Sequence, residues 1–375
     1  MLPVNGEIFN MNRILGLSRA QRGLLAAIVV ALAFIAPFAM AEVGLRVRHR
    51  IKYGNLWGIE ETYKIDDASG LRIPVPGGSF GGIRINSLGF RGPELAVPKP
   101  PSTVRVAFLG SSTTYCAEVS NNENTWPHLV TEALKAESPG VNVDYVNAGV
   151  PGYGIAHSLR NLETRVGRLN PDIIVIYEGH NDLTSNSFDL AVKQGIASKR
   201  TEQTLSWPTK YSLFWYLVEK NLFISAVQKD AGEAKGKLTF EKSALTAPFH
   251  RELKELVEAS KRVANRVVLV TFSTRIRRDQ TAEQQTRAAV TSLYYMPYMS
   301  IEGLLEAYAS YNEVVRQVAE ETGAFLIADE NVIPADAEHF ADSVHFTDKG
   351  SHAMAERVVQ GLLKSAVMRE IGSGH

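Results

Sequence analysis

Val104-Arg-Val-Ala-Phe-Leu-Gly-Ser-Ser-Thr-Thr-Tyr-Cys116 is the stretch that decides the fold. Its first half, 104–109, is a mostly apolar run of strand length with β-branched residues, which is typical of a buried parallel strand. The run ends at Gly110, whose backbone freedom suits a sharp exit, and small hydroxyl residues follow. The stretch therefore predicts a strand that delivers Ser112 onto a tight turn. Because Gly-Ser pairs are also ordinary turn residues, a catalytic role for Ser112 depends on partners elsewhere.

The chain beyond this stretch alternates predicted strands with predicted helices. Further strands are expected at 141–147, 172–177, 266–272 and 325–329, and helices at 123–136, 155–169, 250–265, 302–321 and 348–363. In the last helix Met354, Val358 and Leu362 repeat at four-residue spacing, which predicts one apolar face against a sheet. Parallel neighbours need a crossover, so the alternation predicts an α/β fold with a doubly wound parallel five-stranded sheet flanked by helices.

Composition bounds the function classes. The 375 residues carry 40 basic and 40 acidic side chains, so the chain lacks the basic footprint of a nucleic-acid partner. Cys116 is the one cysteine, which forbids an intrachain disulfide and leaves the redox compartment open.

An uncharged run at 23–41 follows a polar tail at 1–22. Nineteen helical residues nearly cross a hydrocarbon core of ~30 Å, so a transmembrane anchor is the favoured interpretation. The alternative is a cleaved signal peptide, because Ala39-Met-Ala41 has the form of a cleavage site. A targeting segment of 41 residues would exceed the usual ~15–30. A buried core helix is the least favoured interpretation, because charged chain flanks the run on both sides.

The main domain is expected at 102–368, after a linker at 42–101 that is rich in Pro and Gly. The linker is interpreted either as a small β element packed onto the domain or as a plain spacer. Two inserts, at 183–248 and 275–300, would lie over one rim of the sheet. They are either a substrate wall, with tyrosines for sugars and arginines for anions, or a core-covering helix and a solvated basic loop.

Chemistry-bearing residues follow several predicted strands, where an open α/β sheet binds its ligands. They are Ser112, Asn147-Ala-Gly149, Gly179-His-Asn-Asp182 and Asp342-Ser-Val-His345. A serine hydroxyl needs a base, and that base needs an orienting group; His345 and Asp342 supply the residue types for these two roles. The backbone N–H groups of Ser112 and Gly149, with the amide of Asn181, are candidates for an oxyanion hole.

Competing chemistries have weaker support. Cys116 lies one turn beyond Ser112 if a helix begins there, which favours a small core residue over a nucleophile. The glycines at 149, 152 and 154 lack dinucleotide-binding spacing, and His345 and His352 form no zinc-binding pattern. We therefore expect no cofactor and no metal.

These blocks together resemble the SGNH hydrolase superfamily, also called the GDSL esterase/lipase family. Ser112, Gly149, Asn181 in Gly-x-Asn-Asp, and Asp342 with His345 match the family's blocks residue by residue. One departure is Ser111, where the best-known block has Asp; Gly110-Ser-Ser-Thr-Thr114 resembles the Gly-Gly-Ser-Thr-Thr variant of many bacterial members. Asn86-Ser-Leu-Gly-Phe-Arg91 resembles the lead-in of membrane-anchored members.

The resemblance implies a flavodoxin-like SGNH fold and a serine esterase that acts on acyl groups of a cell-envelope glycan or lipid, with possible polysaccharide machinery as partner. It also implies a periplasmic domain, although Arg46, Arg48, Arg50 and Lys52 slightly favour the cytoplasm for the carboxyl side of the run. Two alternatives stay open: an O-acetyltransferase with the same triad, and a binding or assembly module that has lost catalysis.

Overall fold

A five-stranded parallel sheet forms the centre of the protein. The computed structural model describes residues 18–53, 62–197, 206–230 and 237–364; residues 1–17 of the predicted tail, with parts of the linker, the first insert and the carboxyl end, lie outside them. The sheet order is β6-β5-β7-β8-β9, and every neighbouring pair is parallel. The strands are β5 (Thr103–Gly110), β6 (Asn142–Asn147), β7 (Ile173–Tyr177), β8 (Arg266–Val270) and β9 (Phe325–Ile327). The predicted doubly wound fold is confirmed.

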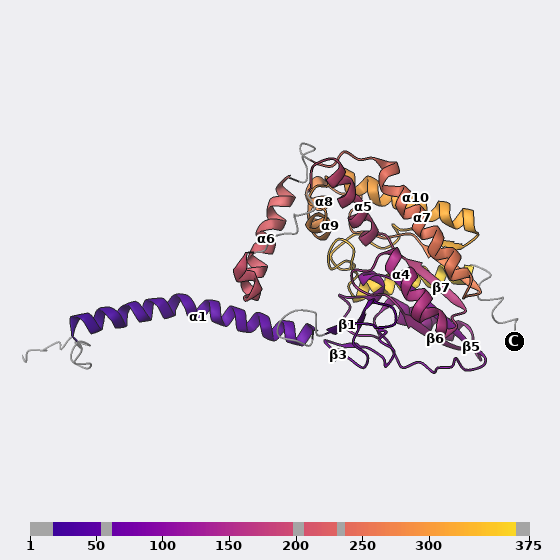
Figure 1. The fold of residues 1–375 in the computed structure, drawn as a ribbon, viewed down its shortest axis with the longest axis horizontal. Coiled ribbons are helices and arrows are strands. Elements are labelled where there is room, and N and C mark those ends of the chain that lie inside the picture. Colours follow the sequence, from indigo (N-terminus) through magenta and orange to yellow (C-terminus); the bar gives the residue numbers. More distant parts are fainter. Residues whose placement is uncertain (1–17, 54–61, 198–205, 231–236, 365–375) are drawn as a thin grey trace, which may run out of the picture.

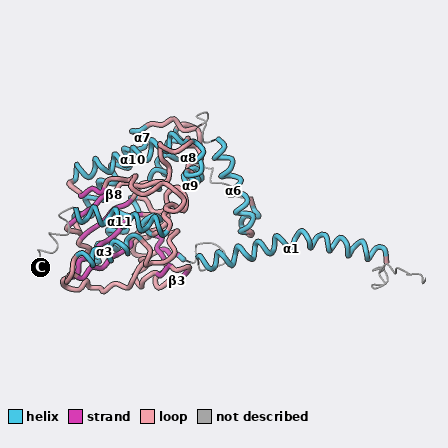
Figure 2. The backbone as a smooth tube through the Cα atoms, turned by 180° about the vertical axis from the view of Figure 1, so that it is seen from behind, coloured by secondary structure: helices cyan, strands magenta, loops and turns pink. Residues whose placement is uncertain are grey.

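Helices cover both faces of this sheet (Figures 1 and 2). One face carries α3 (Trp126–Glu137) and α11 (Asp348–Lys364), and the other carries α4 (Ile155–Asn161), α7 (Lys242–Lys261) and α10 (Ile301–Thr322). All residues of β5 and β7 are buried, as their apolar runs require. Met354, Val358 and Leu362 of α11 are fully buried, so the predicted apolar face is confirmed.

The order of the strands places a switch point between β5 and β7. From β5 the chain passes outward to β6 on one side, and from β7 it passes to β8 and β9 on the other. Ligands of open α/β sheets bind at such points, beyond the carboxyl ends of the strands. Ser112 directly follows β5, and Asn181 lies just beyond β7.

Several helices differ from prediction. The helix expected at 155–169 ends at Asn161 and continues as a π turn, Leu162–Val166, and a 3-10 turn, Gly167–Leu169. The first insert begins inside α5 (His180–Lys193). This helix was not predicted, because its Asn, Asp, Ser and Thr residues are weak helix formers. The inserts also contain α6 (Leu213–Asp230), α8 (Ala282–Ala288) and α9 (Val290–Tyr295).

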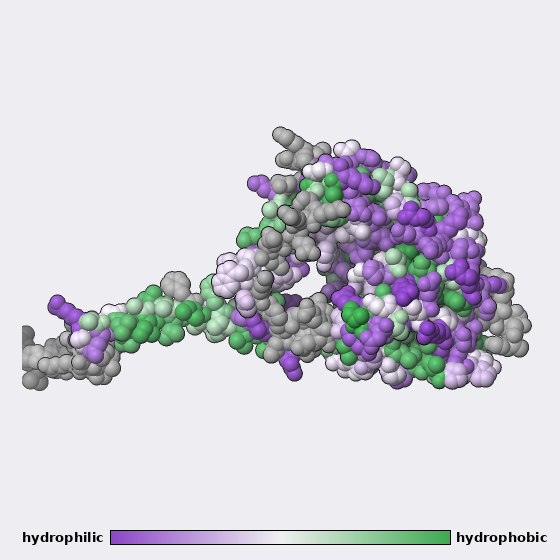
Figure 3. Space-filling model, in the orientation of Figure 1, coloured by the Kyte–Doolittle hydropathy of each residue, from purple (hydrophilic) through white to green (hydrophobic). Residues whose placement is uncertain are grey.

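The amino-terminal helix α1 (Arg19–Tyr53) projects from the domain (Figure 1). It is longer than the predicted span and continues past Ala41 into the predicted linker. Its apolar stretch is unburied and appears as an apolar projection in Figure 3, so it is not a core helix. By length and composition α1 can cross a membrane, and the same two features also fit a signal sequence.

The linker forms two antiparallel hairpins against the domain. They are β1 (Tyr63–Ile65) with β2 (Arg72–Pro74), and β3 (Ser79–Phe80) with β4 (Ile83–Arg84). Leu71 and Ile73 pack with Val150 and Tyr153, which follow β6. The segment therefore adds a small apolar layer beside the carboxyl edge of the sheet.

Arg91, at the end of the Asn86–Arg91 lead-in, is buried beneath the turn that carries Ser112. Its guanidinium donates to the carbonyl oxygens of Tyr115 (3.0 Å), Cys116 (2.6 Å) and Asn121 (2.9 Å) and to Asn122 Oδ1 (3.0 Å). Hydrogen bonds to a charged group are stronger than neutral ones, so this fan of bonds fixes the chain after Ser112.

Two buried carboxyl groups, Glu178 and Asp182, lie beneath the switch point. Asp182 Oδ1 accepts from the N–H of Ile155 (2.9 Å), which ties α4 to α5, and Glu178 Oε1 accepts from Ser158 Oγ (2.5 Å). Burial raises the pKa of both carboxyls, and the charge of Asp182 adds to the effect on Glu178. The folded protein therefore retains protons here that the unfolded chain releases.

Replacing Arg91→Lys should lower the free energy of unfolding by at least about 3 kcal/mol, because an ammonium cannot reach all of these acceptors and leaves buried carbonyls unpaired. Urea unfolding of the full chain measures the change. Arg84→Lys is the matched control, since its exposed ion pair with Glu123 predicts a change below about 1 kcal/mol. Equal effects of the two substitutions would contradict the role of Arg91.

Asp182→Asn should change how stability depends on pH. Above pH ~4 the unfolded chain ionises this carboxyl while the folded chain keeps the proton. The free energy of unfolding of the wild-type protein therefore falls as the pH rises. Asparagine keeps a side-chain oxygen that can accept from the Ile155 N–H, and it does not ionise, so its contribution to stability does not fall with pH. The stability of the variant relative to wild type should rise by about 1.4 kcal/mol per pH unit between the unfolded and folded pKa values. A difference that does not vary with pH from 4 to 8 would refute the buried-acid interpretation.

Candidate active site

Ser112, His345 and Asp342 form a hydrogen-bonded chain at the carboxyl edge of the sheet. Ser112 opens the four-residue helix α2 (Ser112–Tyr115) directly after β5, and the other two lie on the loop before α11. The Ser112 Oγ to His345 Nε2 distance is 2.8 Å, and His345 Nδ1 lies 2.7 Å from Asp342 Oδ2. This is the arrangement in which a base can take a hydroxyl proton while a carboxylate orients the base.

Asp342 is held as a carboxylate by its surroundings. Burial opposes its ionisation, but the hydrogen bond and charge of His345 and the N–H groups of Val344 and His345 hold its pKa well below the ordinary value. Those N–H groups each donate to Oδ1 at 2.9 Å. One oxygen therefore shapes the loop, and the other meets the imidazole.

Helix α2 is too short to stabilise itself, and side chains from three other segments donate hydrogen bonds to its carbonyl groups. The Ser112 carbonyl accepts from the backbone N–H of Ala117 (3.1 Å), whereas the carbonyls after it have no partner within the helix, as at any helix carboxyl end. Trp126 Nε1 donates to Thr113 O (3.0 Å), Asn147 Nδ2 donates to Thr114 O (3.0 Å), and Arg91 covers the next two carbonyls. The position of Ser112 is thus set by the linker, by α3 and by the end of β6.

Two glycines allow the segments at this edge to approach each other. A Cβ on Gly110 would lie 2.1 Å from Thr114 Oγ1, and one on Gly149 would lie 2.5 Å from the backbone N of Tyr115. The predicted reason for Gly110 was backbone freedom, whereas the structure shows that the requirement is space. Gly149 is likewise needed because the chain after β6 runs against α2.

The candidate oxyanion donors have partners of their own. The Gly149 N–H donates to Asn147 Oδ1 (3.1 Å), and Asn181 Nδ2 donates to the carbonyl of Tyr153 (2.7 Å). The second Asn181 amide hydrogen is not used in that bond. The N–H of Ser112 lies in the first turn of α2, where helical N–H groups have no acceptor within the helix.

Cys116 ends α2 in a left-handed conformation and is buried. Burial raises the pKa of its thiol to about 11, so the thiol stays protonated and unreactive at neutral pH. Its sulfur lies 3.4 Å from the Thr114 carbonyl. Cys116 is therefore a core residue, as predicted.

A buried polar chain behind the triad was not foreseen from sequence. His180 Nδ1 lies 2.7 Å from Tyr308 Oη, which lies 2.9 Å from Ser292 Oγ. Ser343 Oγ, next to Asp342, accepts from the N–H of Ser292 (3.2 Å). Burial, together with the charge of His345, lowers the pKa of His180 to about 4, so His180 is neutral at pH 7. The only sequence signal was His180 itself, within Gly-His-Asn-Asp.

The second insert contributes Ser292 to this series of hydrogen bonds, and its arginines contact other parts of the protein. Arg278 pairs with Glu302 and Glu306, while Arg277 donates to the carbonyls of Ile276 (3.2 Å), Glu330 (3.3 Å) and Ile333 (3.4 Å). For the arginines, these contacts favour a structural role over a wall of anion-binding groups.

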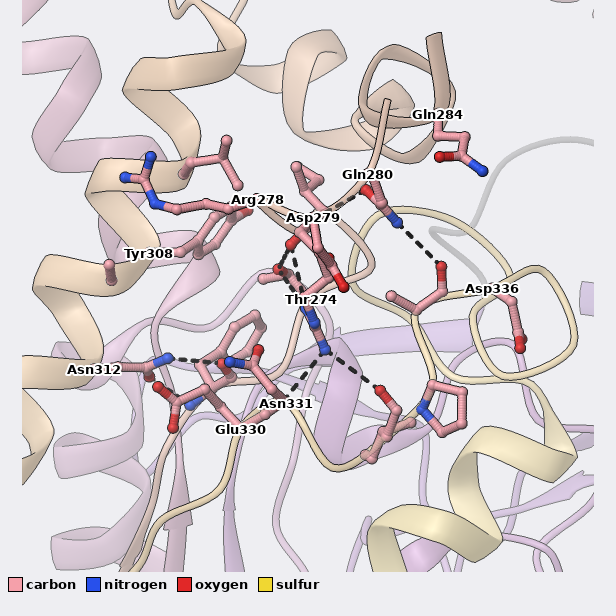
Figure 4. A pocket seen from close by; sticks show the side chains of 18 residues that line it. Thr274, Arg278, Asp279, Gln280, Gln284, Tyr308, Asn312, Glu330, Asn331 and Asp336 are labelled. Carbon is pink, nitrogen blue, oxygen red and sulfur yellow. Dashed lines mark hydrogen bonds between the residues drawn. The ribbon is translucent and has the colours of Figure 1, made fainter. Parts of the chain in front are cut away.

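A cavity of about 690 Å³ lies beside this insert, between α10 and the loops after β8 and β9 (Figure 4). Its lining includes Tyr308 and Asn312 but none of the three triad candidates. Asn312 is bonded to the Phe272 backbone at both amide atoms, and Gln280 donates to the carbonyls of Arg275 and Ala335. These polar groups bind the walls of the cavity to each other. Because its lining contains none of the triad candidates, the cavity is distinct from the site around Ser112.

Comparison with solved structures gives distant likenesses. Axe2, an acetylxylan esterase from Geobacillus stearothermophilus, is 16% identical over 69% of this chain and 94% of its own, with a TM-score of 0.42. LAE5, an alpha/beta hydrolase from the metagenome of Lake Arreo, gives the same identity, coverage and TM-score. A lipase/acylhydrolase from Enterococcus faecalis is 17% identical over 69% of this chain and 95% of its own, with a TM-score of 0.40. No curated protein matches the chain.

The family assignment rests on a sequence match that covers most of the sheet and the site. Residues 108–353 match the GDSL-like lipase/acylhydrolase family, a range that contains Ser112, Gly149, Asn181, Asp342 and His345. The chain belongs to the GDSL-like lipase/acylhydrolase family of the SGNH hydrolase superfamily.

Proposed function

We propose that the protein is a membrane-anchored serine esterase that removes ester-linked acyl groups from a glycan or lipid of the cell envelope. The observation that carries this proposal is the hydrogen-bonded chain from Ser112 through His345 to Asp342 in a member of an acylhydrolase family. A domain that only binds has no need of this three-residue alignment.

In this mechanism Ser112 Oγ attacks the ester carbonyl carbon while His345 Nε2 takes the hydroxyl proton. The tetrahedral intermediate carries its negative charge on oxygen. The proposed donors are the N–H of Ser112, the Asn181 amide and the N–H of Gly149, which would exchange its bond to Asn147 Oδ1 for one to the oxyanion. His345 then returns the proton to the departing alcohol, which leaves an acyl group on Ser112. Water, activated by the same imidazole, releases the acid and restores the serine.

The anchor and the location belong to the same proposal. The apolar stretch of α1 is long enough to hold the domain at a membrane, and we place the domain on the periplasmic side. An O-acetyltransferase would use the same triad with a sugar hydroxyl in place of water. Acetate released from an acetylated glycan supports hydrolysis, and acetyl groups found on an added sugar acceptor support transfer.

Ser112→Ala should lower the rate of p-nitrophenyl acetate hydrolysis by several orders of magnitude, because it removes the atom that attacks the ester. Ser111→Ala is the matched control, since it removes a neighbouring hydroxyl that is directed at Thr113 instead of His345. A fluorophosphonate probe should label wild type and Ser111→Ala but not Ser112→Ala. Equal hydrolysis by Ser112→Ala, or an unlabelled wild-type protein, would favour a catalytically silent module.

Asp342→Asn should lower kcat by about 10⁴-fold with the fold retained, because an amide N–H facing Nδ1 forces the imidazole into the tautomer that cannot accept from Ser112. Steady-state kinetics measures the loss, and circular dichroism checks the fold. Asp336→Asn is the matched control, since Asp336 makes the same kind of contact with His339 (2.7 Å) away from the triad. Comparable rates for the two variants would refute the role of Asp342.

A further inference from the structure

Exposed aromatic side chains gather where the first insert meets α1. Trp207 begins a 3-10 turn, Trp207–Lys210, and Tyr211 follows it; the two side chains are 74% and 70% exposed. Trp215 on α6 is 39% exposed and Leu222 is 66% exposed. The first six residues of α6, Leu-Phe-Trp-Tyr-Leu-Val, are all apolar or aromatic, so such side chains surround its first turns. A helix of this kind is buried or covered in its working environment.

The contact with α1 fixes where these aromatic residues lie. Glu42 accepts from the N–H groups of Leu213 (3.0 Å) and Phe214 (2.8 Å), and so caps the start of α6. The rings of Phe38 and Phe214 meet edge to face at 5.1 Å, and Arg46 donates to the Tyr211 carbonyl (2.8 Å). The start of α6 is therefore attached to α1 at the end of the apolar run (Figure 1).

That position is the boundary of a bilayer if the apolar run fills its core. Nineteen residues at about 1.5 Å each span nearly the ~30 Å of hydrocarbon, so Glu42 would begin the headgroup zone. Tryptophan and tyrosine concentrate in this zone, because their rings are apolar and their N–H or O–H groups are polar. Basic residues also follow the run, at Arg48 and Arg50, and suit anionic headgroups.

We propose that the segment 206–230 is a second membrane contact: its aromatic residues lie in the headgroup zone of the bilayer that α1 spans. The occupant of the exposed face is lipid, because the face continues the apolar surface of α1 and has the composition of an interfacial belt. This inference rests on the proposed membrane anchor. It goes beyond that anchor by assigning the first insert a lipid-contacting surface in addition to α1.

The insert also connects this surface with the wall of the candidate site. Phe223 of α6 meets the ring of Tyr294 at 5.8 Å, and the Lys220 ammonium lies 5.0 Å from the centre of the same ring. The neighbouring Tyr295 is 6.4 Å from the ring of His180. This series of ring contacts links α6 to His180, which belongs to the buried polar chain behind the triad.

Tryptophan quenching in brominated lipid tests the proposal with the full-length protein. The chain has four tryptophans, and Trp57→Phe leaves Trp126, Trp207 and Trp215. In liposomes of phosphatidylcholine and phosphatidylglycerol, brominated acyl chains should remove most of this emission, because two of the three remaining indoles are placed at the bilayer. Trp126 is fully buried in the domain and serves as the internal control. Trp57→Phe with Trp207→Phe and Trp215→Phe should show almost no quenching.

Flotation of the same liposomes separates the anchor from the insert. Protein that floats and is quenched supports the proposal. Protein that floats without quenching overturns it while leaving the anchor and the esterase proposal intact. Protein that fails to float overturns it because lipid is then not the occupant, and hydrolysis of p-nitrophenyl acetate still tests the enzyme. Emission that responds to protein concentration but not to lipid would assign the face to a second copy of the chain, and would also overturn it.

Discussion

The structure of the site depends on satisfying the carbonyl groups of a four-residue helix. A single helical turn costs more to form than its internal hydrogen bonds return, so α2 cannot hold Ser112 in place alone. Trp126, Asn147 and Arg91 each bring a donor to it, from α3, from the end of β6 and from the linker. The three donors are buried, which makes their bonds costly to break and the position of Ser112 well defined.

This constraint gives the linker a role in the site. Arg91 lies in a segment that could have been a spacer, yet its guanidinium binds the carbonyl groups of Tyr115 and Cys116 at the end of the helix that Ser112 begins. Asn147 acts in two directions, since its Nδ2 binds the Thr114 carbonyl and its Oδ1 accepts from the Gly149 N–H. The geometry of the serine turn and of one proposed oxyanion donor is therefore coupled through one amide side chain.

Local patterns were enough to predict the sheet and the residues that gather at its edge. The apolar runs of β5 and β7 are recognisable as buried strands from sequence alone. The order of strands and helices then brings Ser112, Asn181 and His345 to one edge. Long-range side-chain contacts could not be predicted in this way. Tyr308 lies 128 residues from His180, and nothing near it in the sequence shows that its hydroxyl meets an imidazole. Helix α5 was also missed, because its buried face contains Ser187 beside Leu183 and Leu190, and tertiary packing outweighs its weak propensity.

The cap that joins Glu42 to α6 has a consequence for the order of assembly. Glu42 and Leu213 are 171 residues apart, so the carboxylate leaves the ribosome long before the N–H groups that donate to it. At a synthesis rate of about 5–20 residues per second, this interval is on the order of 10–30 s. During that time β5, β6 and β7 are made, since all three lie between the two partners. Helix α1 and the catalytic domain therefore become one unit late in biogenesis, after most of the sheet has been synthesised.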